Sequence, residues 1–347
     1  MKCVKKNFGI LNNRKINLFV LSNDNGFSAG CISYGAALQS LYFPDAPEKS
    51  VVLGFDNLRD YVKNKYYLGV SLGRTAGRIG GASFKTDGVV FTLSKNEGKN
   101  TLHGGENGFH RIIWNAKILE TGADRCGVKF FTVIKPEYDG FPGEMQAEIS
   151  YILNNSNELE IIFKALSDKT TLFNPSNHAY FNLGKEKTIL NHCLQINAPY
   201  YLELNDENIP TGRKINTVGT AYDFTKKRLI GTSLKNLSNN YSIKNKGLDT
   251  PYCLNSKQAA VLEDENSARR ITVLTDRNAL VAYSANYFES GWNINGENSV
   301  PYMGIALEAQ TLPDAPNHED FGNIILRAGE VKEYRTVFKM EKYNSST

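Results

Sequence analysis

The chain has 347 residues, 41% of them hydrophobic, and a formal net charge of +4. That length suits one large domain or two ordinary ones, and the apolar share can bury a substantial core. The small charge is spread without long runs, which excludes both the basic footprint of a nucleic-acid-binding protein and a polybasic membrane patch. We expect no membrane span, because no run of about 18 apolar residues occurs. We expect a cytoplasmic protein, because the N-terminus lacks the apolar segment of a signal peptide.

Strand patterns dominate the chain from beginning to end. Residues 30–42 predict strands with bends or bulges at two glycines. Further strands are predicted, in chain order, at 51–56, 89–94, 145–153, 159–165, 271–275, 279–285, 302–309 and 332–340. They are short, and those at 89–94, 145–153, 159–165 and 332–340 alternate apolar with polar residues, which is the pattern of half-buried sheet.

The clearest pattern is a hairpin between residues 145 and 165. One face of its first strand carries the apolar residues Met145, Ala147, Ile149, Tyr151 and Leu153. Residues 154–158 read Asn-Asn-Ser-Asn-Glu, which is the composition of a turn. The return strand keeps the same period of two through Leu159, Ile161, Phe163 and Ala165.

Helical periodicity is nearly absent. We expect a helical turn at 57–61, few other short helices, and loops at the Asn- and Gly-rich stretches 231–247 and 290–300. Many strands and few helices predict an all-β protein, a large antiparallel β-sandwich formed by residues 1–347 as a single domain. Two stacked sandwiches are the alternative.

Two histidines stand in unusual surroundings. His178 lies in the stretch 174–183, Asn-Pro-Ser-Asn-His-Ala-Tyr-Phe-Asn-Leu, among amides and aromatics that could wall a polar pocket. His103 is followed by two glycines, which shape the backbone and leave the imidazole accessible. A lone histidine is more often structural, so each is a hypothesis. Arg78 follows Gly77, and without a function it would be an exposed arginine at a turn.

Carboxylates supply the remaining candidates. Glu308 and Gln310 end an apolar strand pattern, where Glu308 is either an outward charge or a partly buried base. Asp249 lies between a glycine-containing turn and Pro251, and turn formation is its default explanation. The five histidines show no HxxxH or HxH spacing, and the five cysteines are odd in number with no CxxC pair. We therefore expect neither a metal site nor a disulfide framework.

Together these stretches resemble the aldose 1-epimerases, also called galactose mutarotases. The similar motifs follow in family order over about residues 30–340, namely 75–79, 96–98 with 101–105, 174–183, 209–212, 247–249, 307–310 with 313–315, and 326–330. Departures are Thr250 and Pro251, where many members have His and Asn, and Arg213, where an acidic residue is common. They place substrate preference in question and leave the catalytic motifs intact.

The resemblance implies a galactose mutarotase-like supersandwich with an open sugar cleft, no metal and no organic cofactor. It implies that Glu308 is the general base and His178 the general acid. It further implies that the substrate-binding residues are Arg78, His103, Asp249, Tyr180, Gln310 and Asn96. The implied substrate is a free monosaccharide such as galactose or glucose, with neither nucleic acid nor membrane as a partner, and with monomer and homodimer both open.

The chemistry explains why such residues are needed. Interconverting the α and β anomers of an aldose breaks the bond between C1 and the ring oxygen. A base takes the proton of the C1 hydroxyl while an acid protonates the ring oxygen, which suits a carboxylate and an imidazolium. We expect the two side chains to face each other across one hexose. The alternatives are a hexose-6-phosphate 1-epimerase, a non-catalytic carbohydrate-binding sandwich, and a glycoside hydrolase using Glu308 with Asp249.

Overall fold

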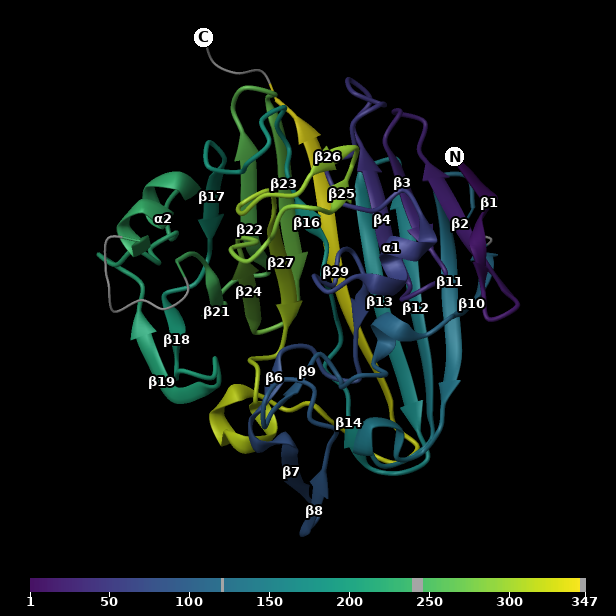
Figure 1. The fold of residues 1–347 in the computed structure, drawn as a ribbon, viewed down its shortest axis with the longest axis vertical. Helices are drawn as coiled ribbons and strands as arrows, with labels where there is room; N and C mark the ends of the chain where they lie inside the picture. Colours follow the sequence, from purple (N-terminus) through teal and green to yellow (C-terminus); the bar gives the residue numbers. More distant parts are fainter. Residues whose placement is uncertain (120–121, 239–245, 344–347) are drawn as a thin grey trace.

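The computed structural model describes residues 1–119, 122–238 and 246–343 and shows a protein built mainly of antiparallel strands (Figure 1). Its largest element is a nine-stranded sheet in the order β10-β11-β12-β13-β29-β23-β22-β17-β20. In chain order these strands are β10 (Asn115–Leu119), β11 (Arg125–Ile134), β12 (Met145–Asn154), β13 (Glu158–Ser167), β17 (Cys193–Ile196), β20 (Arg228–Leu229), β22 (Gln258–Asp264), β23 (Arg269–Thr275) and β29 (Val331–Lys342).

Two smaller sheets have four and six strands. The four-stranded sheet is β1 (Lys2–Leu11), β2 (Arg14–Ser22), β3 (Ser28–Ile32) and β4 (Ala37–Tyr42), in that order. The six-stranded sheet has the order β16-β27-β24-β21-β18-β19. Its strands are β16 (Tyr180–Phe181), β18 (Tyr200–Leu204), β19 (Pro210–Asn216), β21 (Asp249–Cys253), β24 (Ala279–Tyr283) and β27 (Ile305–Gln310).

Short strand pairs and turns complete the chain. The two-stranded pairs are β5 (Ser71–Leu72) with β15 (Ser176–Asn177), β6 (Arg78–Ile79) with β9 (Thr101–Leu102), β7 (Ser83–Thr86) with β8 (Val89–Thr92), β14 (Thr171–Leu172) with β28 (Ile325–Leu326), and β25 (Asn293–Ile294) with β26 (Glu297–Asn298). The α-helices are α1 (Leu58–Lys63) and α2 (Ile230–Ser238). Single 3-10 turns lie at Gly80–Ala82, Phe109–Arg111, Tyr138–Gly140, Ala315–Asn317 and Glu319–Phe321. Within the described ranges, no helix is long and apolar enough to cross a bilayer.

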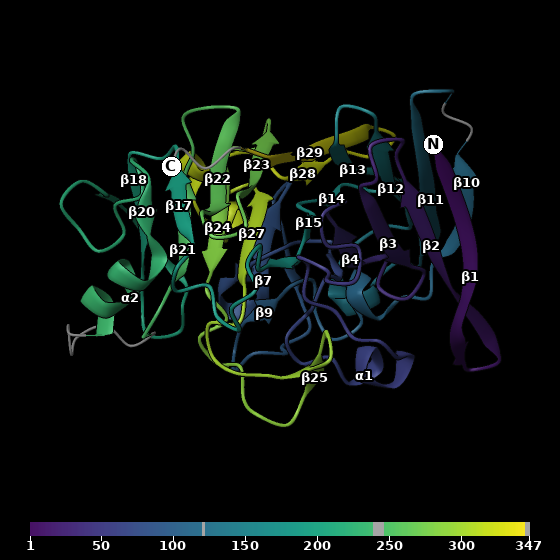
Figure 2. The same ribbon diagram turned by 90° about the horizontal axis from the view of Figure 1, so that it is seen from above.

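The sheets form two layers with the core between them. Seen from above, the nine-stranded sheet spans the molecule, and the two smaller sheets lie side by side against it (Figure 2). Phe19 of β2 meets Phe130 of β11 across this interface, with ring centroids 5.8 Å apart. Leu307 of β27 and Val273 of β23 belong to the same buried cluster. Alternate apolar residues therefore fill the space between layers, as in sandwiches generally.

Most predicted strands are confirmed. The hairpin at 145–165 is β12 and β13, with Leu153 opposite Leu159 and the predicted face buried. The later strands correspond to β23, β24, β27 and β29. Residues 51–56 are buried as expected at their start, but they form only an isolated bridge from Val52 to Phe181 in place of a strand.

The helix predictions have mixed outcomes. The helical turn at 57–61 is α1, where the Asn57 side chain accepts a hydrogen bond from the Asp60 N–H as an N-cap. The loop predicted at 231–247 is wrong over 231–238, which belong to α2, and its residues 239–245 lie outside the described chain. The signal for α2 was the spacing of Ile230, Leu234 and Leu237, all of which are buried.

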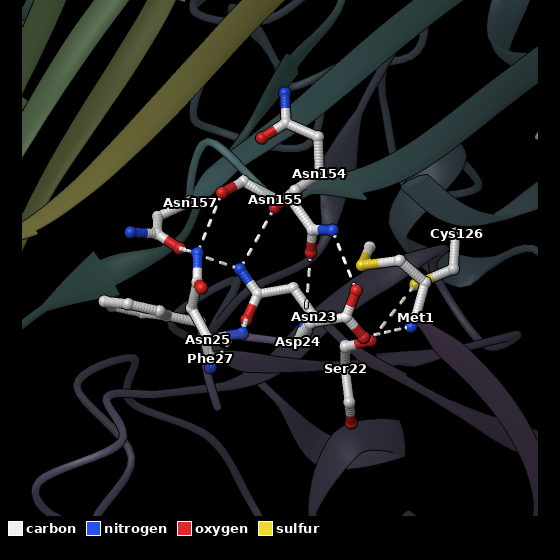
Figure 3. A network of polar contacts seen from close by, with 10 residues as sticks. All are labelled: Met1, Ser22, Asn23, Asp24, Asn25, Phe27, Cys126, Asn154, Asn155 and Asn157. Atoms are coloured by element: carbon white, nitrogen blue, oxygen red, sulfur yellow. Dashed lines mark hydrogen bonds and ion pairs between the residues drawn. The ribbon is translucent and has the colours of Figure 1, made fainter. Parts of the chain in front are cut away.

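A cluster of amides ties the β2–β3 turn to the β12–β13 turn (Figure 3). The Asn23 amide donates to the Asn154 carbonyl at 3.0 Å and to Asn157 Oδ1 at 2.8 Å. Asn23 Oδ1 accepts from the N–H groups of Asn25 and Phe27 at 3.1 and 2.9 Å. The Met1 ammonium pairs with Asp24 beside this cluster. One buried side chain thus joins the two sheet layers at one end.

Replacing Asn23 by alanine should lower the free energy of unfolding by about 2–4 kcal/mol, because four hydrogen bonds of about 1 kcal/mol each are lost. Urea denaturation measures the change. Ser156→Ala is the matched control, because Ser156 is exposed in the same β12–β13 turn. Equal stability of the two variants would show that the amide cluster does not hold the layers together.

Candidate active site

A pocket of about 450 Å³ lies on one face of the six-stranded sheet. Alternate residues of three adjacent strands line it: Glu308 and Gln310 from β27, Val281 and Tyr283 from β24, and Asp249 and Pro251 from β21. The register puts Glu308 beside Val281, and Asp249 beside Tyr283. Because side chains alternate across a strand, this period of two aims all six at one space.

The opposite wall comes from the β6–β9 pair and the loops next to it. Arg78 of β6 and His103, just after β9, line the pocket from this side. His103 has a left-handed backbone (φ 51°), and the following Gly104 has φ 85°. A Cβ on Gly104 would lie 1.9 Å from the Gly73 carbonyl oxygen, so only glycine fits. The His-Gly-Gly sequence therefore lets two backbone segments approach closely, and this turns the imidazole toward the pocket.

The protonation of His103 follows from its hydrogen bond. Its Nδ1 accepts the Gly77 N–H at 3.2 Å. In a neutral imidazole only one nitrogen carries a proton, so Nε2 is the donor. Burial holds the pKa of His103 well below its usual range, which keeps the ring neutral. His103 can thus donate to a ligand oxygen.

His178 and Glu308 form the centre of the pocket. His178 Nε2 lies 3.4 Å from Glu308 Oε1, and both side chains are almost fully buried. Burial lowers the pKa of His178 to about 3. Burial, with a smaller contribution from the Asp249 carboxylate, raises the pKa of Glu308 well above its usual range, against the opposing charge of Arg78. Both shifts favour the neutral forms, so a charged carboxylate and a charged imidazole are stable here only when each compensates the other.

A second ion pair shapes the pocket beside this centre. Arg78 Nε and Nη2 donate to the two carboxylate oxygens of Glu97 at 2.5 and 2.8 Å. This two-pronged contact fixes the guanidinium plane. Our sequence analysis missed Glu97, although it lies in the motif 96–98. Glu97 could have been identified as the partner of Arg78, because a half-buried arginine needs a carboxylate partner.

Several buried polar atoms aim at the pocket without a protein partner. Gln310 is fully buried, and among residues 1–119, 122–238 and 246–343 neither its Oε1 nor its Nε2 has a hydrogen-bond partner. Glu308 Oε2 likewise has no hydrogen-bond partner among those residues. Buried polar groups are nearly always hydrogen-bonded, so these atoms are suited to bind ligand hydroxyls.

The structure brings together seven of the eight predicted site residues. The pocket is lined by Arg78, His103, His178, Tyr180, Asp249, Glu308 and Gln310. Asn96 lies outside its lining, where its side chain bonds both the N–H and the carbonyl of Leu102. Asn96 therefore supports the segment before His103. At 3.4 Å, His178 and Glu308 are adjacent and do not face each other across a ring.

Three of these side chains could also coordinate a metal ion. His103, His178 and Glu308 offer ligand atoms that all lie within 4.8 Å of one another. Histidine spacing in the sequence cannot reveal this grouping, because the residues come from distant segments. The fit to a metal is poor, because the His103 Nδ1 lone pair accepts the Gly77 N–H and leaves the proton on the other nitrogen. A metal at that nitrogen would have to displace the proton or break the hydrogen bond.

Comparisons of the sequence and of the fold with known proteins identify similar epimerases. The family model described as Aldose 1-epimerase matches residues 17–339. An aldose 1-epimerase of Streptococcus thermophilus is 37% identical, with 100% of each chain covered. A maltose epimerase of Levilactobacillus brevis is 34% identical over 96% of this chain and 97% of its own. The crystal structure of a galactose 1-epimerase from Lactobacillus acidophilus NCFM superposes with a TM-score of 0.88 at 30% identity, covering 99% of both chains.

Burial of histidines should make the protein sensitive to acid. Burial lowers the pKa of His110 to about 3, with a smaller effect of Arg111. Between pH 6.5 and 3 the unfolded chain therefore binds a proton that the folded chain excludes, so stability falls as the pH falls. His110→Phe should reduce the slope of unfolding free energy against pH by about 1.4 kcal/mol per unit in this range. Urea titrations at several pH values test this, and parallel curves for variant and native protein would contradict it.

Proposed function

The chain belongs to the aldose 1-epimerase family, and we propose that it interconverts the α and β anomers of free hexoses, galactose and glucose among them. One observation carries the residue assignment. A carboxylate and an imidazole approach to 3.4 Å inside a pocket whose remaining polar atoms aim at a ligand. The protein is thus an isomerase, and Glu308 and His178 are its proposed base and acid.

The reaction uses the closeness of the two groups. The C1 hydroxyl oxygen and the ring oxygen are both bonded to C1, so the two atoms to be addressed are themselves neighbours. Glu308 takes the proton of the C1 hydroxyl, His178 gives a proton to the ring oxygen, and the C1–ring oxygen bond breaks. The open-chain aldehyde turns about its C1–C2 bond. Closure on the other face reverses both proton transfers, and the chain returns to its starting state.

The shared burial of the pair explains how it exchanges protons near neutral pH. A lone imidazolium in this pocket is disfavoured, as is a lone carboxylate. A sugar that turns its C1 hydroxyl and its ring oxygen toward the pair gives one proton and receives another, so the net charge of the site does not change during the step. Each positioned transfer typically contributes about 10²–10⁴-fold to the rate.

The other pocket residues hold the sugar in our proposal. Arg78, fixed by Glu97, and the neutral His103 donate to hydroxyl oxygens. Asp249 and Gln310 accept from or donate to further hydroxyls. The ring of Tyr180 packs beside His178 with centroids 4.8 Å apart, and its hydroxyl donates to the Tyr66 carbonyl. Asn96 supports His103 through Leu102 and has no proposed contact with the sugar.

Charge argues against a phosphorylated substrate. The two cations of the pocket lining already face carboxylates, Lys65 with Glu289 and Arg78 with Glu97. Two further acidic side chains, Asp249 and Glu308, line the same space. A hexose 6-phosphate would bring two more negative charges into it. Reducing disaccharides such as maltose present the same C1 group and are a second proposed substrate class.

Other expectations from the sequence stay predictions. These are the single domain over residues 1–347, the cytoplasmic location, the absence of nucleic-acid and membrane partners, independence of cofactors and metals, and the choice between monomer and homodimer.

Glu308→Gln and His178→Asn should each lower turnover by about 10²–10⁴-fold, because each removes one positioned proton transfer. Polarimetry on freshly dissolved α-galactose measures the rate, with EDTA present as a check for metals.

Matched controls are Glu263→Gln and His192→Asn, which change a buried carboxylate and a buried imidazole of the nine-stranded sheet and its flank. The controls should lose stability and keep their turnover per folded molecule. A near-native rate in either pocket variant would remove that residue from the mechanism.

A further inference from the structure

Tyr67 packs beside both histidines of the pocket, whose own ring centroids are 5.4 Å apart. Its ring meets the edge of His103 at a centroid distance of 4.7 Å and an interplanar angle of 68°. It stacks on His178 at 6.0 Å and 25°. Behind it lies His110, at 5.0 Å and 71°. One tyrosine ring therefore contacts both histidines that face the ligand, and a third buried histidine supports it.

The backbone around Tyr67 is held firmly against the segment of His178. The Gly69 N–H donates to the His178 carbonyl at 3.0 Å, and the His178 N–H donates to the Val70 carbonyl at 2.9 Å. The Asn64 side chain bridges this loop by bonding the N–H and carbonyl of Leu68. Tyr67 itself has φ 56°, in the left-handed region that tyrosine rarely adopts. Such strained positions cluster at functional sites, where surrounding contacts fix them.

His178 needs such a support because, in the described chain, no hydrogen bond from another residue holds its Nδ1. A histidine that transfers protons is usually held through its second nitrogen. In the part of the chain that the structure describes, His178 Nδ1 is buried and has no hydrogen-bond partner. Its plane is set by aromatic rings instead, Tyr67 at 25° and Tyr180 at 38°. His103, at 89° to His178, is held by the same Tyr67 ring.

We propose that Tyr67 is the positioning residue that fixes the planes of His178 and His103 at right angles, so that one imidazole serves the ring oxygen and the other a hydroxyl. The inference rests on the proposed function of the pocket. The aromatic ring performs this role, and the face it turns to His178 also favours the imidazolium that ring opening requires. The phenol oxygen is not needed for it.

A purely structural tyrosine would give a different result. Loss of its ring would then lower the melting temperature and leave the rate per folded molecule unchanged. A positioning residue moves the rate, because a small misplacement of an acid relative to the ring oxygen is costly to the chemical step. Measurements of kcat and of the environment of the imidazoles therefore distinguish the two roles.

The test compares Tyr67→Leu with Tyr67→Phe in the full chain. Tyr67→Leu should lower kcat for galactose about 10- to 100-fold, with a smaller change in KM. Tyr67→Phe keeps the ring and should stay within about threefold of the native kcat. In spectra of isotope-labelled histidine, the ring signals of His103, His110 and His178 should shift in the leucine variant and stay near native in the phenylalanine variant. Single histidine substitutions assign these signals.

Tyr61→Leu serves as the matched control, because it removes a buried tyrosine ring from the same segment. Tyr61 packs on Phe55 and Phe8 and makes no ring contact with these histidines in the described chain. It should lose stability and keep its kcat.

Three results separate the possible failures. Native kcat in folded Tyr67→Leu, with Glu308→Gln inactive, would overturn the positioning role alone. Equal losses in the leucine and phenylalanine variants would overturn the claim that the ring is what matters. Failure of the native protein to accelerate galactose mutarotation would refute the proposed function itself.

Discussion

The structure is organised around one constraint: an imidazole and a carboxylate lie 3.4 Å apart where water is largely excluded. Burying two ionisable groups is costly unless each compensates the other. Rigid antiparallel strands provide the means to hold them there. Glu308 lies in β27, which pairs with β24 on one side and with β16 on the other. His178 lies just before β16 in the chain. The nine-stranded sheet packs behind this sheet and supports the strands from the other side.

The adjacency of the pair carries a chemical consequence. A proton donor and a proton acceptor that lay on opposite sides of a sugar would suit two atoms that are far apart on the ring. Here both groups occupy one wall, which suits two oxygens bonded to the same carbon. The opposite wall, with Arg78 clamped by Glu97 and His103 locked in one tautomer, has the fixed donors that recognition of hydroxyls requires. In our proposal catalysis lies on one wall, while recognition uses both, because Asp249 and Gln310 share the sheet face of Glu308.

The sequence predicted much of this arrangement, and the limits are physical. The strand predicted at 302–309 is β27, which carries Glu308, and the hairpin at 145–165 forms with its predicted face buried. Glu97 and Tyr67 were missed because their roles depend on contacts between segments far apart in sequence. Helix α2 was missed because its one glycine, its one asparagine and its serines obscured the spacing of Ile230, Leu234 and Leu237. Asn96 was assigned to the sugar, whereas its amide is occupied by Leu102.

The assignment of acid and base is tested most directly by a crystal structure of Glu308→Gln with galactose bound. Our account places the C1 hydroxyl within hydrogen-bonding distance of the residue 308 side chain, at about 2.6–3.2 Å, and the ring oxygen equally near His178 Nε2. A galactose bound with C1 toward the Arg78–Glu97 end, with both oxygens remote from His178, would contradict it.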